Sequence, residues 1–430
     1  MKNQNLSLSL IVCLVCALLF SCKKNPGAEE IARQKAEAIE LAKEAAVSEY
    51  VSSLSTEAKI SQIFLVNIEG NSKYSAVEQF NGKPLVPGGV LLFSYNISND
   101  PLETYDYIKS IRDFYLQNDN PPPFVAVDQE GGYVNRLRNL TSPLVSQKMV
   151  ADTLSLENAE KLYSSQARQM KNLGFHLNLA PVVEVETDEN KDFLDTRSFG
   201  SLEKVLSYGK IAVEAYEKNG IATVLKHFPG NSNADPHVGL PKITFSDSEK
   251  EKYFTPFRKL LPLSSAILMS HAIMKPEITE NDGNVEKYEL PACFSTHWIQ
   301  NTVKSEFGFS GLVFSDDIFM GALAKNGYPP EIASVKAIES GIDVIMLSEK
   351  KFGSVLEILS KKAGEDENFS NELDRAVKNV IRFKIKFGIL EMTENPVPEN
   401  EIPAFKVQVK PDYAEFDLKK FDEDYKAGSL

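Results

Sequence analysis

The middle of the chain alternates between short apolar runs and longer, helix-like segments. Each run is five or six residues long and is bounded by turn residues. A continuous apolar run of this length predicts a strand that is buried on both faces, as in a parallel sheet. The runs are residues 63–67, 89–94, 124–128, 176–181, 222–227, 266–271, 312–316 and 344–348.

The segments between the runs predict helices. Two of them begin with residues typical of helix starts, Ser295 as an N-cap and Pro330 in the first turn. Eight strands that alternate with helices predict an α/β fold, a (β/α)8 TIM-like barrel. An open doubly wound sheet is the competing interpretation, but no glycine-rich phosphate-binding turn follows the first run. The predicted helices are residues 102–117, 156–173, 202–219, 246–261, 295–307, 330–340 and 371–387.

The amino terminus has the pattern of an export signal. Lys2 is followed by an apolar run over residues 6–20, which is short for a membrane-spanning helix. The run ends in Leu19-Phe20-Ser21-Cys22, which resembles a bacterial lipoprotein signal in which Cys22 is lipidated. An ordinary signal peptide and an uncleaved anchor are the alternatives. We expect attachment to a membrane through the lipid, at the bacterial cell envelope.

The composition changes at both ends of the predicted barrel. Residues 1–21 are the expected signal peptide, and residues 22–52, rich in Ala, Glu and Lys, predict a charged spacer helix. Residues 53–390 form the expected single catalytic domain. Several prolines after residue 390 predict an irregular tail over residues 391–430, which lies against the body or is partly disordered.

Net charge and cysteine usage narrow the class of protein. The chain has 47 Lys and Arg against 60 Asp and Glu, a net charge of −13, which argues against a general nucleic-acid binder while leaving room for a local basic patch. Three of its four cysteines lie in the first 22 residues, so neither a disulfide framework nor a zinc site is expected. We expect no metal and no organic cofactor.

Polar residues end several of the predicted strands. Barrel enzymes place their active sites at the carboxyl ends of the strands. A set of bases and carboxylates there predicts one polar cup and favours an enzyme over a structural barrel. The residues are Asn67, Asp128, Lys226 with His227, His271, and Asp316 with Asp317.

A series of motifs in fixed order resembles the β-N-acetylglucosaminidase branch of glycoside hydrolase family 3. The resemblance extends over about residues 54–390 and implies a single barrel domain without the second domain of other branches. The motifs include Pro87-Gly88-Gly89-Val90, Asp128-Gln129-Glu130-Gly131-Gly132, Ala180-Pro181-Val182-Val183-Glu184, Arg197-Ser198-Phe199-Gly200, Lys226-His227-Phe228-Pro229-Gly230, Asp235-Pro236-His237 and Ser315-Asp316-Asp317.

The resemblance implies a role for each matching residue. Asp316 corresponds to the catalytic nucleophile, and Asp235 and His237 correspond to a loop dyad in which the histidine is the general acid and base. A retaining glycosidase needs a nucleophile and a separate proton donor. A histidine can be the proton donor because the ordinary imidazole pKa lies near the operating pH. The residues that correspond to sugar-hydroxyl ligands are Asp128, Arg136, Arg197, Lys226 and His227.

The implied activity is that of a retaining exo-β-N-acetylhexosaminidase with a covalent glycosyl-aspartate intermediate. Its carbohydrate substrate would carry a terminal N-acetylglucosamine, as in peptidoglycan fragments or chitooligosaccharides. A β-glucosidase or other exo-glycosidase on the same scaffold and a non-catalytic sugar-binding lipoprotein are the alternatives, and a metal-dependent hydrolase is a weaker third. Phosphorolysis in place of hydrolysis and the oligomeric state stay open.

Three positions depart from the family pattern. Tyr133 stands where the family usually has Arg, and Glu184 stands where it usually has Asp. The loop over residues 231–237 is two residues shorter than the family's, lacks its first His and Gly, and contains Pro236. Substrate detail and loop motion are therefore the least predictable features.

Overall fold

The computed structural model describes residues 28–76, 79–80, 82–234, 238–277, 288–348, 352–398 and 401–429. Contacts divide the chain into two compact units. One contains helix α2 (Ala28–Ser53) and residues Glu391–Gln408. The other contains Leu54–Leu390 and Val409–Leu430. Helix α2 corresponds to the predicted spacer helix, and Cys22 lies outside the described residues.

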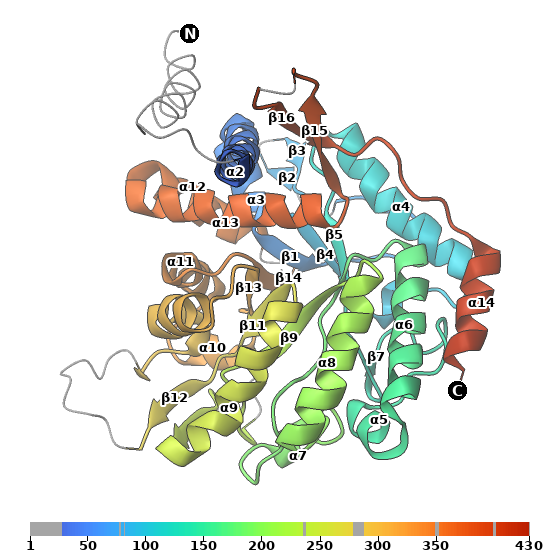
Figure 1. The fold of residues 1–430 in the computed structure, drawn as a ribbon. Coiled ribbons are helices and arrows are strands. Elements are labelled where there is room, and N and C mark those ends of the chain that lie inside the picture. The colour runs from blue at the N-terminus through green and yellow to red at the C-terminus, as the bar shows by residue number, and fades with distance from the viewer. Residues whose placement is uncertain are drawn as a thin grey trace. The chain divides into compact units, whose positions relative to one another are not determined.

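The larger unit is a barrel of eight parallel strands with helices around it, as predicted (Figure 1). The strands follow the order β13-β11-β9-β8-β5-β4-β1-β14. A parallel bridge between Phe314 and Val344, with the Ser315 amide donating to the Val344 carbonyl at 2.9 Å, joins the two ends of the sheet. The strands are β1 (Phe64–Asn67), β4 (Gly89–Leu92), β5 (Phe124–Val127), β8 (Leu177–Asn178), β9 (Ala222–Phe228), β11 (Ala266–Met269), β13 (Leu312–Ser315) and β14 (Ile345–Ser348).

Apolar side chains of the strands fill the barrel. The ring centroid of Phe124 lies 6.3 Å from that of Phe314 and 5.4 Å from that of Phe383. Gly89 on the neighbouring strand is required there, because a Cβ atom would lie 2.2 Å from the Phe124 ring. The eight runs are therefore apolar because both faces of each strand are covered.

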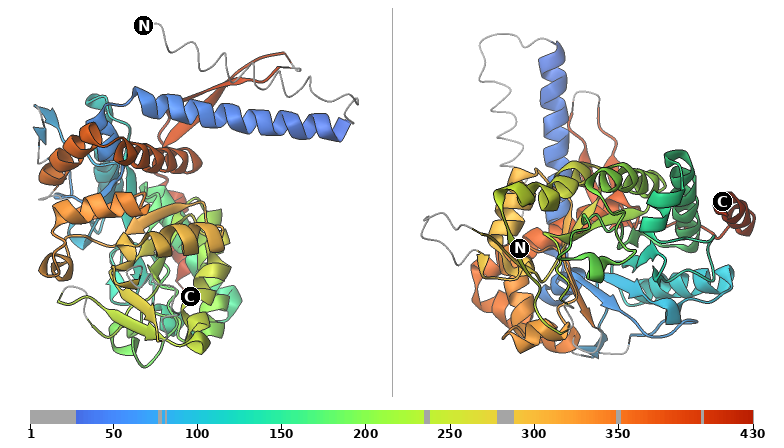
Figure 2. Two further views of the ribbon diagram at one scale, coloured as in Figure 1. Left: turned by 90° about the vertical axis from the view of Figure 1, so that its left-hand side faces the viewer. Right: turned by 90° about the horizontal axis from the view of Figure 1, so that it is seen from below.

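Helices surround the strands in all views (Figures 1 and 2). The first six predicted helices appear close to their expected bounds, although the segment before β13 is a π-helix, η5. The last predicted helix starts earlier, at Glu367, and α12 in front of it was not predicted. The helices are α3 (Thr56–Gln62), α4 (Pro101–Gln117), α5 (Gln147–Thr153), α6 (Leu156–Leu173), α7 (Lys191–Leu194), α8 (Leu202–Lys218), α9 (Asp247–Leu260), η5 (His297–Glu306), α10 (Gly321–Lys325), α11 (Pro330–Ser340), α12 (Phe352–Glu365) and α13 (Glu367–Lys386).

Short two-stranded sheets and single-turn helices extend the loops of the larger unit. One pair, β6 with β7, comes directly after β5 and Asp128, and its first strand contains Gln129 and Glu130 of the Asp-Gln-Glu motif. The pairs are β2 (Gln79–Phe80) with β3 (Lys83–Pro84), β6 (Gln129–Gly131) with β7 (Val134–Asn135), and β10 (Lys242–Phe245) with β12 (Ile273–Pro276). The single turns are η1 (Ser94–Asn96), η2 (Leu261–Leu263) and η4 (Ala292–Phe294).

The segment after residue 390 is more regular than the predicted irregular tail. It forms a hairpin of β15 (Leu390–Asn395) and β16 (Ala404–Val409), followed by α14 (Leu418–Gly428). Helix α14 lies beside α6 (Figure 1), where Asp424 forms an ion pair with Arg168 and its carbonyl accepts a hydrogen bond from Ser165. No helix among the described residues is both long enough and apolar enough to cross a membrane.

Candidate active site

Four strands deliver the predicted polar residues to the carboxyl end of the barrel. Asp128 directly follows β5, and Lys226 lies near the end of β9. His271 follows β11, and Asp316 directly follows β13. Because all these strands are parallel, their carboxyl ends meet at one face, which makes this face the candidate site.

A network of charges centres on Glu130. The Lys226 Nζ atom lies 2.9 Å from Asp128 Oδ1 and 2.6 Å from Glu130 Oε1. The Nε and Nη2 atoms of Arg197 donate to the two oxygens of Glu130 at 2.8 and 2.9 Å. Three of the predicted sugar ligands, Asp128, Arg197 and Lys226, are therefore brought together, and Glu130 links them.

Burial and ion pairing oppose each other in this network. Burial alone would raise the pKa of Glu130, but Lys226 and Arg197 hold it well below its ordinary value. Burial would lower the pKa of Lys226 and of Arg197, but the carboxylates of Asp128 and Glu130 raise both. Glu130, Lys226 and Arg197 therefore stay ionised at neutral pH and present fixed donors and acceptors, which suits recognition of sugar hydroxyls.

The surroundings of Asp316 favour its ionised form. Its backbone amide donates to the Met269 carbonyl at 3.0 Å, and its Oδ1 atom accepts from the Asp317 amide at 2.9 Å. Burial alone would raise its pKa, but His271, His227 and the Asp317 amide lower it below its ordinary value. An ionised carboxylate held in place by its backbone can act as a nucleophile.

His271 follows β11, the neighbour of β13, and its ring is held on both sides. Its Nε2 atom lies 3.0 Å from the Asp317 carbonyl, and its Nδ1 atom lies 3.2 Å from the Cys293 sulfur. A carbonyl can only accept, so Nε2 carries the proton and Nδ1 faces the thiol. Burial raises the pKa of Cys293 well above its ordinary value, so the thiol stays protonated. We therefore interpret His271 as a support for the Asp316 loop.

Glu184, which stands where the family usually has Asp, contacts both His227 and Asn231. Its Oε1 atom accepts from His227 Nδ1 at 2.6 Å, from the His227 amide at 3.2 Å and from Asn231 Nδ2 at 3.1 Å. Its other oxygen, Oε2, is buried and has no hydrogen-bond partner among the described residues. The longer arm of Glu184 thus fixes the His227 ring and reaches the first part of the shortened loop.

Arg136 and Tyr133 lie on the β6–β7 hairpin side of the site. The Arg136 guanidinium lies 5.2 Å from the centre of the Phe93 ring, and its buried Nε atom has no hydrogen-bond partner among the described residues. Among the described residues, Arg136 is not one of the side chains that pair with Glu130. Tyr133, in place of the family's Arg, is 75% exposed. The hairpin therefore carries one exposed aromatic side chain, and the guanidinium that follows it lies against Phe93.

The predicted acid and base residues, Asp235 and His237, lie outside the described residues. The chain that leads to them is held at two points. Ser270 donates to the Gly230 carbonyl at 2.9 Å. Asn233 Oδ1 accepts from the amides of Asp192 and Phe193 at 3.0 and 3.3 Å. Hydrogen bonds therefore fix the segment that leads into this loop.

Sequence reasoning missed the central role of Glu130 and the contact of Asn231 with Glu184. Glu130 is part of the Asp-Gln-Glu motif, which was the available signal, but its partner Arg197 is 67 residues away. Among the described residues, no group of three or more His, Cys, Asp or Glu side chains has the arrangement to hold a metal ion.

Comparison with known proteins places this site in a family. The model of the glycosyl hydrolase family 3 N-terminal domain matches residues 55–383. A β-hexosaminidase of Tolumonas auensis is 32% identical over 277 residues, which is 62% of this chain and 77% of that protein. A β-hexosaminidase of Haemophilus influenzae is 27% identical over 316 residues, which is 70% of this chain and 84% of that protein.

Solved structures share the barrel. A family 3 β-N-acetylglucosaminidase from Paenibacillus sp. superimposes with a TM-score of 0.69 at 23% identity over 78% of this chain, which spans 63% of that protein. LpqI of M. tuberculosis gives a TM-score of 0.65 at 25% identity, with 79% of this chain and 96% of that protein covered. With the ionised Asp316 and the Glu130 network at the carboxyl end of the barrel, these matches show that the chain is a glycoside hydrolase and belongs to family 3.

Proposed function

We propose that this glycoside hydrolase is a retaining exo-β-N-acetylhexosaminidase that releases terminal β-linked N-acetylglucosamine. The observation that carries the proposal is the position of Asp316, an anion directly after β13 at the same end of the barrel as the Glu130 network. The hexosaminidase names of the sequence relatives support the sugar class. Peptidoglycan fragments and chitooligosaccharides are the proposed natural substrates.

The proposed reaction has two steps. In the first, an Asp316 oxygen attacks the anomeric carbon as the glycosidic bond breaks, and the His237 imidazolium gives its proton to the leaving oxygen. In the second, His237 removes a proton from water, the water oxygen attacks the anomeric carbon, and Asp316 leaves as a carboxylate. Lys226, Arg197 and Asp128 would hold the sugar hydroxyls in both steps.

A panel of aryl glycosides tests this function. The wild-type chain is expected to cleave 4-nitrophenyl N-acetyl-β-glucosaminide and to leave the β-glucoside largely intact. Faster cleavage of the β-glucoside would favour the alternative exo-glycosidase. No cleavage of either compound, together with saturable binding of N-acetylglucosamine, would favour a sugar-binding protein that does not turn over.

The product of the second step separates hydrolysis from phosphorolysis. A histidine such as His237 is neutral or positively charged, so it repels an incoming phosphate less than a second carboxylate would. We propose water as the acceptor, so free N-acetylglucosamine is the expected product even in phosphate buffer. Detection of the 1-phosphate sugar by mass spectrometry would overturn this part of the proposal.

We also propose that lipid at Cys22 attaches the enzyme to the bacterial cell envelope. The proposal rests on the apolar run before Cys22 and on the charged helix that follows it. The wild-type protein is expected in the detergent phase of a detergent–water partition, and Cys22→Ser is expected in the aqueous phase. Wild-type protein found wholly in the aqueous phase would contradict the anchor.

A further inference from the structure

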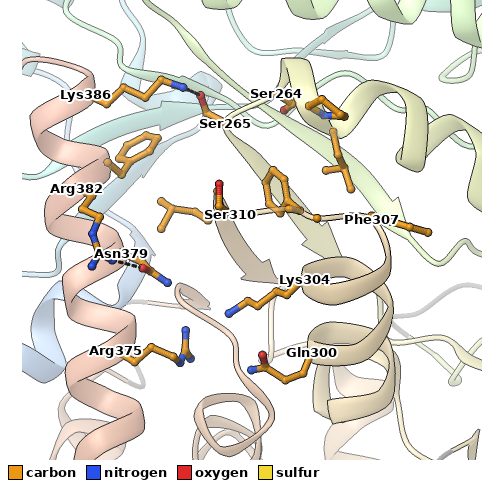
Figure 3. Close-up of a pocket in the computed structure, with 17 residues that line it drawn as sticks. Ser264, Ser265, Gln300, Lys304, Phe307, Ser310, Arg375, Asn379, Arg382 and Lys386 are labelled. Atoms are coloured by element: carbon orange, nitrogen blue, oxygen red, sulfur yellow. Dashed lines mark hydrogen bonds between the residues drawn. The ribbon is translucent and has the colours of Figure 1, made fainter. Parts of the chain in front are cut away.

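A cavity of about 840 Å³ lies at the amino ends of β11 and β13, at the opposite face of the barrel from Asp316. Ser264 and Ser265, directly before β11, line it, and so do residues 307–311, directly before β13. The remaining walls come from η2, from η5 and from α13 (Figure 3). We call this space the basal cavity.

Four cationic side chains line the basal cavity: Lys304, Arg375, Arg382 and Lys386. No carboxylate is among the described residues that line it, although Asp and Glu outnumber Lys and Arg by 60 to 47 in the whole chain. Figure 3 shows Lys304 of η5 and Arg375 of α13 pointing toward each other across the space. The cavity is therefore a local basic site in an acidic protein.

The two inner cations are held from behind by a buried acid. Asp343, 1% exposed, forms an ion pair with Arg375 and lies 3.8 Å from Lys304 Nζ. Glu372 also accepts from Arg375, at 2.7 Å, without lining the cavity. Burial lowers the pKa of Lys304, Asp343 raises it and Arg375 lowers it again, and the net result is below the ordinary value. Asp343 thus fixes both cations at the wall of the cavity.

The two outer cations lie one helical turn apart on α13 and are exposed. The Arg382 Nη1 atom donates to Asn379 Oδ1 at 2.6 Å, and Lys386 Nζ donates to Ser265 Oγ at 2.8 Å (Figure 3). Glu217, which lies 3.7 Å from Lys386 Nζ, does not line the cavity. Each of these two bonds goes to a neutral side chain that also lines the cavity.

We propose that the basal cavity binds a phosphorylated small molecule. Its volume lies in the range of about 300–1,000 Å³ that is typical of small-molecule sites. Arginine and lysine side chains bind phosphate oxygens through charge-assisted hydrogen bonds, and the four cations approach the cavity from two facing helices. Phe307 and Phe309 on the wall between those helices supply an apolar surface for the rest of the ligand.

Calorimetric titration with inorganic pyrophosphate at constant ionic strength tests the proposal. The wild-type chain is expected to bind at one saturable site. The double variant Arg382→Gln with Lys386→Gln is expected to bind at least about tenfold more weakly, since it lacks two charge-assisted contacts. The double variant Lys361→Gln with Lys378→Gln has the same change in charge outside the cavity and is expected to keep the wild-type affinity.

Three outcomes would overturn the proposal. They are no saturable binding by the wild type, equal weakening in both double variants, and binding to anionic phosphatidylglycerol vesicles but not to pyrophosphate. The last result would identify a lipid surface as the source of the phosphate. Unchanged hydrolysis of an aryl hexosaminide by both double variants is the control for intact folding, because the four substituted residues lie outside the active site.

Discussion

Arg197 holds Glu130 by a bidentate ion pair, with two parallel hydrogen bonds of 2.8 and 2.9 Å. Lys226 approaches the same carboxylate at 2.6 Å, so one buried acid orders two cations of the site. Arg197 comes from the loop after α7 and Lys226 from β9. Glu130 therefore determines where both donors stand before substrate arrives.

Replacing Glu130 by Gln is expected to destabilise the fold as well as the site. Removal of one member of a buried ion pair leaves an uncompensated charge, which typically costs about 3–5 kcal/mol. The free energy of unfolding, measured by urea denaturation, should fall by about that amount. Glu157→Gln breaks the exposed pair with Lys161 and should change nothing measurable. Equal stability of the two variants would contradict the role of Glu130.

The same carboxylate predicts how stability depends on pH. The pKa of Glu130 is held well below its ordinary value, so its stabilisation is present above the unfolded pKa of about 4.3 and is lost as pH falls through the folded pKa. The difference in unfolding free energy between the wild type and Glu130→Gln should therefore be largest near neutral pH and shrink below about pH 4. Denaturation curves across this range measure it, and a constant difference would contradict the shift.

Asp316→Asn is expected to remove at least about nine-tenths of the turnover while the fold stays intact, because the neutral amide cannot form the glycosyl intermediate. Asp317→Asn is the matched control, since Asp317 accepts from the Phe319 amide at 2.9 Å and supports its own loop. Initial rates on an aryl hexosaminide and circular dichroism measure the effect. A larger loss in Asp317→Asn than in Asp316→Asn would exclude Asp316 as the nucleophile.

The barrel could be predicted from the sequence because parallel strands covered on both faces leave continuous apolar runs. The positions of Asp128, Lys226 and Asp316 followed from the same runs, since each residue lies near the end of a strand or directly follows one. Local pattern was enough for these features.

Features that depend on distant pairing could not be predicted in this way. The link from Lys226 to Asp128 joins residues 98 positions apart, and the role of Glu130 depends on two such partners. The region after residue 390 has many prolines, yet β15 pairs with β16 and α14 packs on α6 through Asp424 and Arg168. Proline content predicts local irregularity but carries no information on what the segments between the prolines contact.

His237→Ala should discriminate between substrates by their leaving group. A poor leaving group needs a proton as the glycosidic bond breaks, whereas an activated aryl group departs without one. We expect a loss of about 100-fold or more on disaccharides and a much smaller loss on the 4-nitrophenyl substrate, measured as kcat. Equal losses on both substrates would mean that His237 is not the acid.

Asn233 should act on the same step through the loop that carries His237. Its side chain accepts from the Asp192 and Phe193 amides, and its Nδ2 atom donates to the Asp188 carbonyl at 3.1 Å. Asn233→Ala removes these contacts at a position four residues before His237, so the imidazole should spend less time within reach of the leaving oxygen.

Asn233→Ala is expected to show the same substrate dependence as His237→Ala, with a smaller loss of kcat. Loss of exposed hydrogen bonds worth about 0.5–1.5 kcal/mol each corresponds to roughly a tenfold lower kcat on disaccharides, with little change on the 4-nitrophenyl substrate. Asn172→Ala is the matched control, because Asn172 bridges to the Asp417 backbone with two similar hydrogen bonds on another part of the larger unit. Its activity should equal the wild type on both substrates. If Asn233→Ala lost activity equally on both substrates, the Asn233 side chain would support the sugar site as a whole. Its hydrogen bonds would then not be what positions His237.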